Sequence, residues 1–275
     1  MKHEPRITRI KNVKNLLIIL LVLIAGVGIL GPYIAPHNPL EMNLDEAFKS
    51  PSLTHLFGTD NHGRDVLSRV LCAGRVSLGI GFFAAAVSLL IGLFLGLIAG
   101  FIGGIVDKVI CAIIDITLSF PSLLLAIGIA VVLPPGFISV ILALTLVGWA
   151  SFARFTRGIV WNIRNNCYVE AASILGAKKD RIILKHILPN CLPLVAVTGF
   201  LNLGTFILSE ASLSFLGLGV PPPAPTWGGM INYGREFIQI APWIVIFPGL
   251  ALMITVIACN LLGDRLRDKF DRRAA

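Results

Sequence analysis

Two polar segments interrupt this apolar chain, and their residue types suit hydrogen bonding and docking rather than bond-breaking chemistry. The first segment is Gly58-Thr-Asp60-Asn-His-Gly63-Arg64-Asp65, and the second covers residues 170–190. The sequence contains no G-x-x-x-x-G-K-[ST] phosphate loop, no H-E-x-x-H pair and no Cys/His cluster with metal-ligand spacing. We therefore expect no catalytic residue, no metal ligand and no cofactor on this chain.

In the first polar segment, carboxylates alternate with glycines and an arginine. Asp60 and Asp65 can accept hydrogen bonds from backbone amides or pair with Arg64, and the glycines permit tight turns. The segment is either a self-satisfied polar cap on a helix bundle or a surface that contacts another protein through these three side chains. A calcium loop is disfavoured, because the alternating oxygen ligands and the closing Glu are missing.

The second polar segment predicts two short helices. Asn166 is a suitable N-cap, and Glu170 lies near the first turn, where a carboxylate interacts favourably with the helix dipole. Ala171 and Ala172 allow another chain to approach the backbone closely, and Gly176 can end the first helix in a left-handed conformation. The segment is either a docking surface or an amphipathic loop that rests on lipid headgroups.

Composition places both segments in a membrane protein. Apolar residues make up 56% of the chain and charged residues only 14%, against about 25% charged residues in soluble domains. We predict an all-α integral membrane protein, and the +8 net charge does not indicate nucleic acid, because the basic residues flank apolar spans. Six stretches are candidates for membrane-spanning helices, at residues 13–34, 76–102, 109–133, 137–153, 193–213 and 241–263.

Several residues inside or beside the predicted spans carry structural expectations. Pro121 should kink the third span. A strip of small residues in the second span predicts close packing of another helix, and it consists of Gly92, Gly96 and Gly100. Four tryptophans near the span ends are expected as interfacial anchors, namely Trp149, Trp161, Trp227 and Trp243.

Two acidic residues lie within the apolar spans, Asp115 and Glu210. A carboxylate is costly in lipid and commonly faces a partner or a water-filled path. Both residues are therefore candidates to line a path across the membrane. The competing interpretation is a structural hydrogen bond or, for Glu210, a position near the outer headgroups.

The distribution of Lys and Arg predicts the orientation. With the N-terminus inside, the inner segments hold eighteen of these residues and the outer segments five. This bias predicts that both termini are cytoplasmic. It also places residues 154–192 inside and residues 35–75 outside.

The motifs resemble one family. Glu170-Ala-Ala172, Gly176 and Leu188-Pro189 follow the EAA loop of type-1 ATP-binding cassette (ABC) importer permeases, although His186 replaces the aliphatic residue usual two places before the Leu. Gly58 to Arg69 resembles the GTDxxGRDxxSR signature of the peptide and nickel branch. Three further stretches resemble the same branch, at residues 115–121, 215–230 and 262–268. With them, the resemblance covers residues 58–271.

The resemblance implies a division of the chain and a set of partners. It implies a cytoplasmic tail and first helix at 1–34, an extracytoplasmic loop at 35–75, a permease core at 76–264 with the coupling loop 154–192, and a cytoplasmic tail at 265–275. The implied partners are a second permease chain in a heterodimer, two ABC subunits that hold ATP and Mg, an extracytoplasmic substrate-binding protein and membrane lipid. Contact with the binding protein would involve Asp60, Arg64 and Asp65, and ATPase coupling would involve Glu170, Ala171, Ala172, Gly176 and Ala177.

The expected function is that of a permease subunit of an ATP-driven peptide importer in the plasma (inner) membrane of a prokaryote. A nickel or metal-chelate permease is the alternative within the family. An ion-driven secondary transporter would require inverted repeats with broken helices, and the sequence shows no such symmetry. A membrane enzyme would require a nucleophile, base or metal constellation, and we find none.

Overall fold

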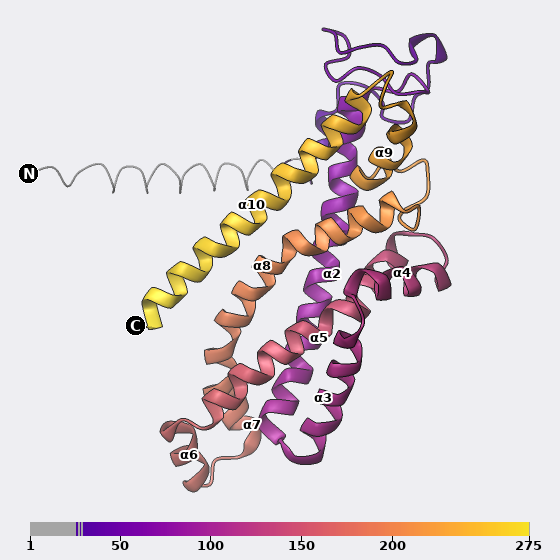
Figure 1. The fold of residues 1–275 in the computed structure, drawn as a ribbon. Coiled ribbons are helices and arrows are strands. Elements are labelled where there is room, and N and C mark those ends of the chain that lie inside the picture. Colours follow the sequence, from indigo (N-terminus) through magenta and orange to yellow (C-terminus); the bar gives the residue numbers. More distant parts are fainter. Residues whose placement is uncertain (1–25, 27, 29, 275) are drawn as a thin grey trace, which may run out of the picture.

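Long apolar runs of this chain fold as helices that pack into one bundle (Figure 1). The computed structural model describes residues 26, 28 and 30–274, with side chains as far as residue 267. The long helices are α2 (Val66–Ile102), α5 (Phe137–Arg164), α8 (Leu188–Phe215) and α10 (Trp243–Ala274). The shorter α-helices are α3 (Gly104–Ser119), α4 (Ser122–Val132), α6 (Cys167–Ile174), α7 (Lys179–Ile182) and α9 (Trp227–Gly234).

Three single-turn elements complete the described chain: the 3-10 helices η1 (Leu44–Glu46) and η3 (Arg235–Phe237) and the π-helix η2 (Ile183–Ile187). Within the described residues, β-type pairing is limited to one bridge between Thr59 and Asp65. The all-α prediction is therefore confirmed.

Five of the six predicted spans fall on described helices that are long and apolar enough to cross a membrane, if a bent pair is taken as one span. The first predicted span, 13–34, lies mostly outside the described residues. The helices extend beyond the predicted bounds, because α2 begins at Val66 and α5 continues to Arg164. α10 continues through residues 265–274, the segment for which the resemblance implies a cytoplasmic tail.

Pro121 divides the third predicted span into two helices. α3 ends at Ser119, Phe120 is extended, and α4 begins directly after the proline. The two helix axes differ by 91°. The change of direction is thus larger than the predicted kink, because the residue before a proline is forced out of the helical conformation.

The glycine strip of α2 is a close helix contact. A Cβ on Gly92 would lie 2.4 Å from Phe152 Cβ, and a Cβ on Gly96 would lie 2.7 Å from the carbonyl oxygen of Ala153. Gly100 meets Val160 in the same way, at 2.9 Å. The predicted packing role is confirmed, and α5 is the helix that fills the strip.

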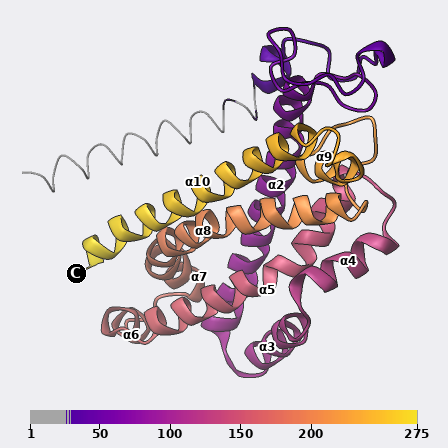
Figure 2. The same cartoon turned by 45° about the horizontal axis from the view of Figure 1, so that its top comes forward.

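The two polar segments lie at opposite ends of the bundle. Figure 1 shows the indigo loop around residues 35–65 at one end, together with α9, and α6 and α7 at the other. The turned view keeps α8 beside α10, with α3 and α4 on the far flank (Figure 2). We call the first end the cap end and the second the loop end.

Buried apolar side chains form separate clusters along this axis. The central cluster joins α2, α4, α5 and α8, with Phe152 and Phe206 stacked at its middle. A second cluster fills the cap end around Trp227. A third lies at the loop end and contains Val160, Val169 and Ile187. α5 contributes to both the central and the loop-end clusters, so its position against α2 affects both.

We expect Gly96→Ala to destabilise the bundle, because the added methyl carbon would meet Thr156 Cβ at 2.6 Å and the Ala153 carbonyl at 2.7 Å. Overpacking of this kind costs about 1–3 kcal/mol. The matched control is Gly158→Ala in α5, where a Cβ meets nothing within 4 Å. Thermal unfolding of the purified chain should show a lower midpoint for Gly96→Ala only, and equal midpoints for both variants would contradict the packing role.

Candidate functional site

The loop end is built on α6, whose limits follow the predicted signals. Asn166 is the N-cap, and its carbonyl accepts hydrogen bonds from the amides of Val169 and Glu170 at 2.9 and 3.2 Å. The Asn166 side chain makes no capping hydrogen bond. The predicted position of the helix start is confirmed, and Glu170 lies in the first turn as expected.

The end of α6 requires a glycine. Gly176 has φ +79°, and its amide donates to the carbonyl of Ser173 at 3.0 Å. The Ala177 amide donates back to the carbonyl of Ala172 at 3.1 Å. This pair of bonds is a Schellman motif, in which a left-handed residue satisfies the last carbonyls of a helix.

Two large apolar side chains project from the tip of this turn. Ile174 is 80% exposed and Leu175 is 87% exposed. The rest of the turn presents small residues, because Ala171 and Gly176 are also exposed. The small residues of this turn were predicted as part of the site and the two apolar ones were not, although their position between Ala172 and Gly176 places them in the same turn. An apolar tip flanked by small residues is suited to insertion into a cleft of a partner protein.

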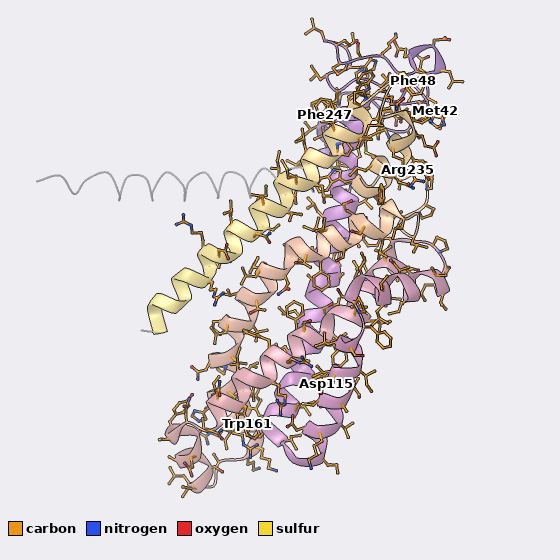
Figure 3. All side chains as sticks on the ribbon, in the orientation of Figure 1. Met42, Phe48, Asp115, Trp161, Arg235 and Phe247 are labelled. Atoms are coloured by element: carbon orange, nitrogen blue, oxygen red, sulfur yellow. The ribbon has the colours of Figure 1, made fainter. Side chains whose placement is uncertain are left out.

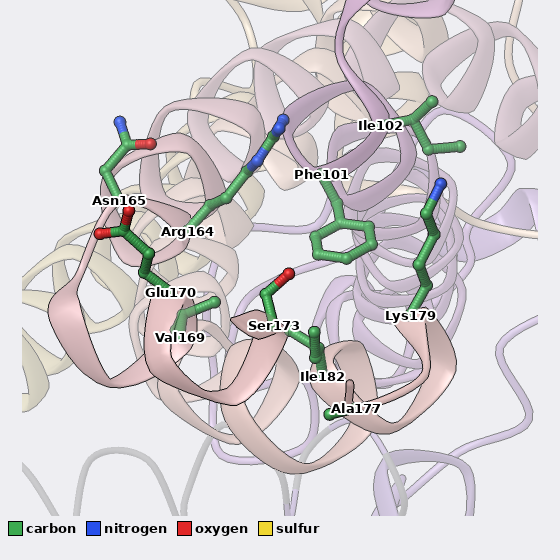
Figure 4. A pocket seen from close by; sticks show the side chains of 10 residues that line it. All are labelled: Phe101, Ile102, Arg164, Asn165, Val169, Glu170, Ser173, Ala177, Lys179 and Ile182. Atoms are coloured by element: carbon green, nitrogen blue, oxygen red, sulfur yellow. The ribbon is translucent and has the colours of Figure 1, made fainter. Parts of the chain in front are cut away.

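A hollow of about 670 Å³ lies between α6 and the ends of α2 and α5. Its walls include the predicted residues Glu170 and Ala177 (Figure 4). Arg164 and Lys179 lie on either side of it, with Phe101 between them in the view. Two of the five predicted coupling residues, Glu170 and Ala177, therefore line this hollow, where a carboxylate and two cations surround an open space.

The second predicted helix of this segment is not an independent element. α7, η2 and α8 form one helical run of 37 residues, Lys179–Phe215. Within this run Ile182 and Ile187 are buried, while Ile183 is half-buried. The π-helical turn lies just before Pro189, whose missing amide cannot support regular helical hydrogen bonding.

Asp115 lies on an exposed face of α3 and pairs with Arg154 of α5. Figure 3 shows Asp115 in the half of the bundle nearer the loop end. The pair borders an open hollow of about 470 Å³ that Arg157 also lines. Arg157 makes a bidentate ion pair with Asp107, in which two guanidinium nitrogens lie 2.5 and 2.7 Å from the two carboxylate oxygens. Charged side chains thus line this hollow between α3 and α5, as a polar path would require.

Glu210 is placed differently. Its side chain is fully buried inside the chain, and Ser214 Oγ donates to Glu210 Oε1 at 2.7 Å. The neighbouring Ser77 Oγ accepts the backbone amide of Trp227 at 3.2 Å. The burial favours the structural interpretation of Glu210 over a position on the wall of a path.

At the cap end, Asp60 organises the predicted turn. Its Oδ1 accepts the amides of His62 and Arg64 at 2.8 and 3.0 Å, and its Oδ2 accepts Arg64 Nε at 2.7 Å. Arg69 Nε lies 3.5 Å from the same oxygen. Because the carboxylate is buried and its two oxygens are used within the chain, the arrangement favours a self-satisfied cap over direct contact with another protein.

Asp65 caps α2 and is equally buried. Its Oδ2 accepts both the amide and the hydroxyl of Ser68, at 2.8 and 2.7 Å, and its Oδ1 lies 2.9 Å from His55 Nδ1. Burial raises the pKa of Asp65, but the hydrogen bonds from Ser68 and His55 outweigh this effect and keep the pKa below its ordinary value. The hydrogen bond from Lys49 similarly lowers the pKa of Glu46, which faces the other nitrogen of His55.

Tryptophans tie the cap to the bundle. Trp243 Nε1 donates to the carbonyl of Thr59 at 3.0 Å. Trp227 Nε1 donates to the carbonyl of Val70 at 3.0 Å, and its ring is buried in the cap-end cluster. The expectation that Trp227 anchors the chain at a membrane interface was therefore wrong, because the sequence did not reveal the fold of residues 217–227 over α2.

Comparison with known proteins establishes the family. Residues 92–275 match the family described as "Binding-protein-dependent transport system inner membrane component". The chain belongs to this family. This family member is therefore a membrane component of an ABC transport system. It has a closed polar cap at one end and an exposed apolar tip at the other.

Its relatives cover most of its length. The dipeptide transport system permease protein DppC of Alkalihalophilus pseudofirmus is 42% identical over 245 residues, which are 89% of this chain and 81% of the relative. The glutathione transport system permease protein GsiD of Escherichia coli is 43% identical over 246 residues, again 89% and 81% of the two chains. The family member is thus a permease subunit of an ABC importer.

A solved structure supports the fold. An inward-facing structure of the MetNI methionine ABC transporter superposes with a TM-score of 0.58 at 22% identity, and the match covers 73% of this chain and 95% of that one. The bundle therefore has the type-1 importer permease fold. This likeness concerns the fold alone.

We expect Gly63→Ala to disrupt the cap. Gly63 has φ +70°, and an added Cβ would lie 1.7 Å from the carbonyl oxygen of Asn43. Gly217→Ala is the matched control, because Gly217 has φ +82° but open space around it. Both variants meet the left-handed penalty of about 1–2 kcal/mol, and only Gly63→Ala adds a backbone clash. Its unfolding midpoint should fall further, and a fall of equal size in Gly217→Ala would refute the crowding argument.

Proposed function

We propose that this family member is one of two permease chains of an ATP-driven peptide importer. The observation that carries the proposal is the exposed apolar tip formed by Ile174 and Leu175, at the opposite end of the bundle from the cap. Such a tip provides a contact for a subunit that hydrolyses ATP. ATP hydrolysis by that subunit at the loop end would then change the packing of the helices that connect the loop end to the cap end.

Peptides are the proposed substrate class. Two relatives that cover 89% of the chain are named for a dipeptide and for glutathione, which is itself a small peptide. These names favour peptide import over the nickel or metal-chelate alternative. Peptides carry both charges and amide groups, and the Asp115–Arg154 pair offers one anion and one cation to such a substrate.

The second permease chain would complete the path. One flank of α4, α5 and α8 contains a hollow of about 130 Å³ with hydroxyl and amide side chains on its wall, including Ser151, Asn202 and Thr205. A hollow open on one side needs a facing surface before it can enclose a substrate. We propose that a homologous chain supplies this surface in a heterodimer and that lipid covers the remaining apolar faces.

ATP and Mg would be bound by two ABC subunits rather than by this chain. In the proposed scheme, the tip of α6 enters a cleft on one of these subunits, with Glu170, Ala171, Ala172, Gly176 and Ala177 at the contact. An extracytoplasmic binding protein would deliver the peptide at the cap end. The buried carboxylates of Asp60 and Asp65 would support that surface from within, and Arg64 would be the more accessible of the three predicted contact residues.

The proposed orientation places the loop end and both termini in the cytoplasm. It rests on the excess of Lys and Arg in the predicted inner segments. It also places the α6 tip on the side of the membrane where ATP is found.

The deciding experiment is reconstitution. The chain is expressed with candidate permease, ATPase and binding-protein genes from its source genome, purified as a complex, and assayed for ATP hydrolysis with di- and tripeptides delivered by the binding protein. Peptide-stimulated hydrolysis supports the proposal. A chain that purifies without any ATPase, or a complex stimulated only by a non-peptide solute, would overturn it.

We expect Leu175→Ser to reduce the amount of ATPase subunit that copurifies with the permease. The substitution removes an apolar contact, but it leaves the fold intact because Leu175 is 87% exposed. Loss of one buried leucine contact is worth about 1.5–3 kcal/mol, so retention should fall by at least tenfold. Leu53→Ser is the matched control, since Leu53 is 97% exposed at the cap end. Equal retention of the ATPase in both variants would argue against docking at the tip.

We expect an impermeant thiol reagent to label position 61 in intact cells and position 179 only in opened membranes. Single cysteines replace Asn61 and Lys179 in a background without the five native cysteines. This background is required because Cys167 is exposed near the loop end. Labelling of position 179 from outside would reverse the proposed orientation.

A further inference from the structure

Three residues that are far apart in sequence meet beneath the cap. His37, His55 and Asp65 each offer one ligand atom, and these atoms all lie within 4.8 Å of one another. His55 Nδ1 is 2.9 Å from Asp65 Oδ1, and His37 Nδ1 is 3.8 Å from Asp65 Oδ2. No local spacing in the sequence predicted this convergence, because each residue comes from a different turn.

Backbone hydrogen bonds fix both histidines in place. The His37 amide donates to Ser68 Oγ at 3.1 Å, and the same hydroxyl donates to Asp65 Oδ2. The His55 amide donates to Ser52 Oγ at 3.1 Å, and the His55 carbonyl accepts the amide of Gly58 at 2.8 Å. These bonds fix the backbone of both residues, and the ring centroids lie 4.8 Å apart.

The partners of these side chains form an outer shell of the kind found around metal ligands. Glu46 Oε2 lies 3.3 Å from His55 Nε2, so that nitrogen can donate to Glu46 while Nδ1 turns toward Asp65. Ser68 holds the other oxygen of Asp65 through its amide and its hydroxyl. A histidine whose second nitrogen donates to a carboxylate is a recurrent feature of zinc sites, because this bond sets the tautomer and the orientation of the ring.

We propose that His37, His55 and Asp65 bind one divalent ion of the zinc class. Two imidazole nitrogens and one carboxylate oxygen match the ligand preference of Zn²⁺ and do not match that of Ca²⁺ or Mg²⁺, which select oxygen ligands. The Asp65 and Glu46 carboxylates balance the two positive charges of the ion. The His37 side chain is 43% exposed, so the fourth position opens toward solvent and takes water.

The ion would fasten the cap to the bundle. It would join His37, close to the start of the cap loop, to Asp65, the N-cap of α2. An ion that binds only the folded arrangement stabilises it by RT ln(1 + c/Kd), where c is the free ion concentration, so the stabilisation grows with the logarithm of that concentration once it exceeds Kd. The inference does not rest on the proposed substrate or on the proposed ATPase contact.

The test uses the full chain, purified with its complex, stripped with a chelator and titrated with ZnCl₂ by calorimetry. We expect one Zn²⁺ per chain and a higher thermal midpoint for the zinc-loaded protein. His37→Ala should weaken zinc binding at least tenfold without lowering the midpoint of the metal-free protein, because its side chain is partly exposed. Glu46→Gln should weaken binding about tenfold, as loss of an outer-shell partner does.

His62→Ala is the control. His62 lies in the same loop and hydrogen-bonds with Asn61 and Arg64 instead of the cluster. Its substitution should leave zinc binding unchanged. Absence of saturable zinc binding by the stripped protein, or equal losses in His37→Ala and His62→Ala, would show that the cluster is only a hydrogen-bonded histidine between two carboxylates.

Discussion

The close contact between α2 and α5 is the constraint on which the rest of this bundle depends. Three glycines of α2 let the backbone of α5 approach so nearly that any Cβ would collide. The consequences extend along α5. Phe152 reaches the central cluster, Arg157 reaches Asp107 of α3, and Val160 forms part of the floor beneath α6. Helices in lipid gain little from apolar burial against one another, so packing of this kind supplies much of their association.

The cap end solves a different physical problem, because a loop of irregular backbone leaves many polar groups to satisfy. Asp60 and Asp65 together accept four hydrogen bonds from nearby backbone or hydroxyl groups. Tryptophan indoles from later in the chain satisfy further carbonyls. The cap is therefore held by directional bonds, whereas the α6 tip projects its apolar residues freely. The cap end is therefore suited to keep a fixed shape, and the α6 tip is suited to bind a partner.

Local signals in the sequence predicted much of this arrangement. The glycine strip, a kink at Pro121 and the left-handed turn at Gly176 were predicted because each depends on the conformational preference of one residue type. The exposure of Ile174 and Leu175 was not predicted, since an apolar pair in a short loop reads equally well as buried. The burial of Trp227 also escaped prediction, and a structural hydrogen bond was only one of the interpretations offered for Glu210. Trp227 is buried because residues 217–227 fold back over α2, and no local pattern encodes that long-range contact.

The continuity of α7, η2 and α8 has a mechanical consequence. A helix of 37 residues is about 55 Å long, and here it begins directly after the α6 turn and carries Glu210 near its far end. A small tilt imposed at Lys179 would be magnified as a lateral swing around Ser209 and Glu210, as at the tip of a lever arm. The π-helical turn at Ile183–Ile187 lies near the start of this helix. Its wider i→i+5 turn allows the helix to twist at this point without breaking.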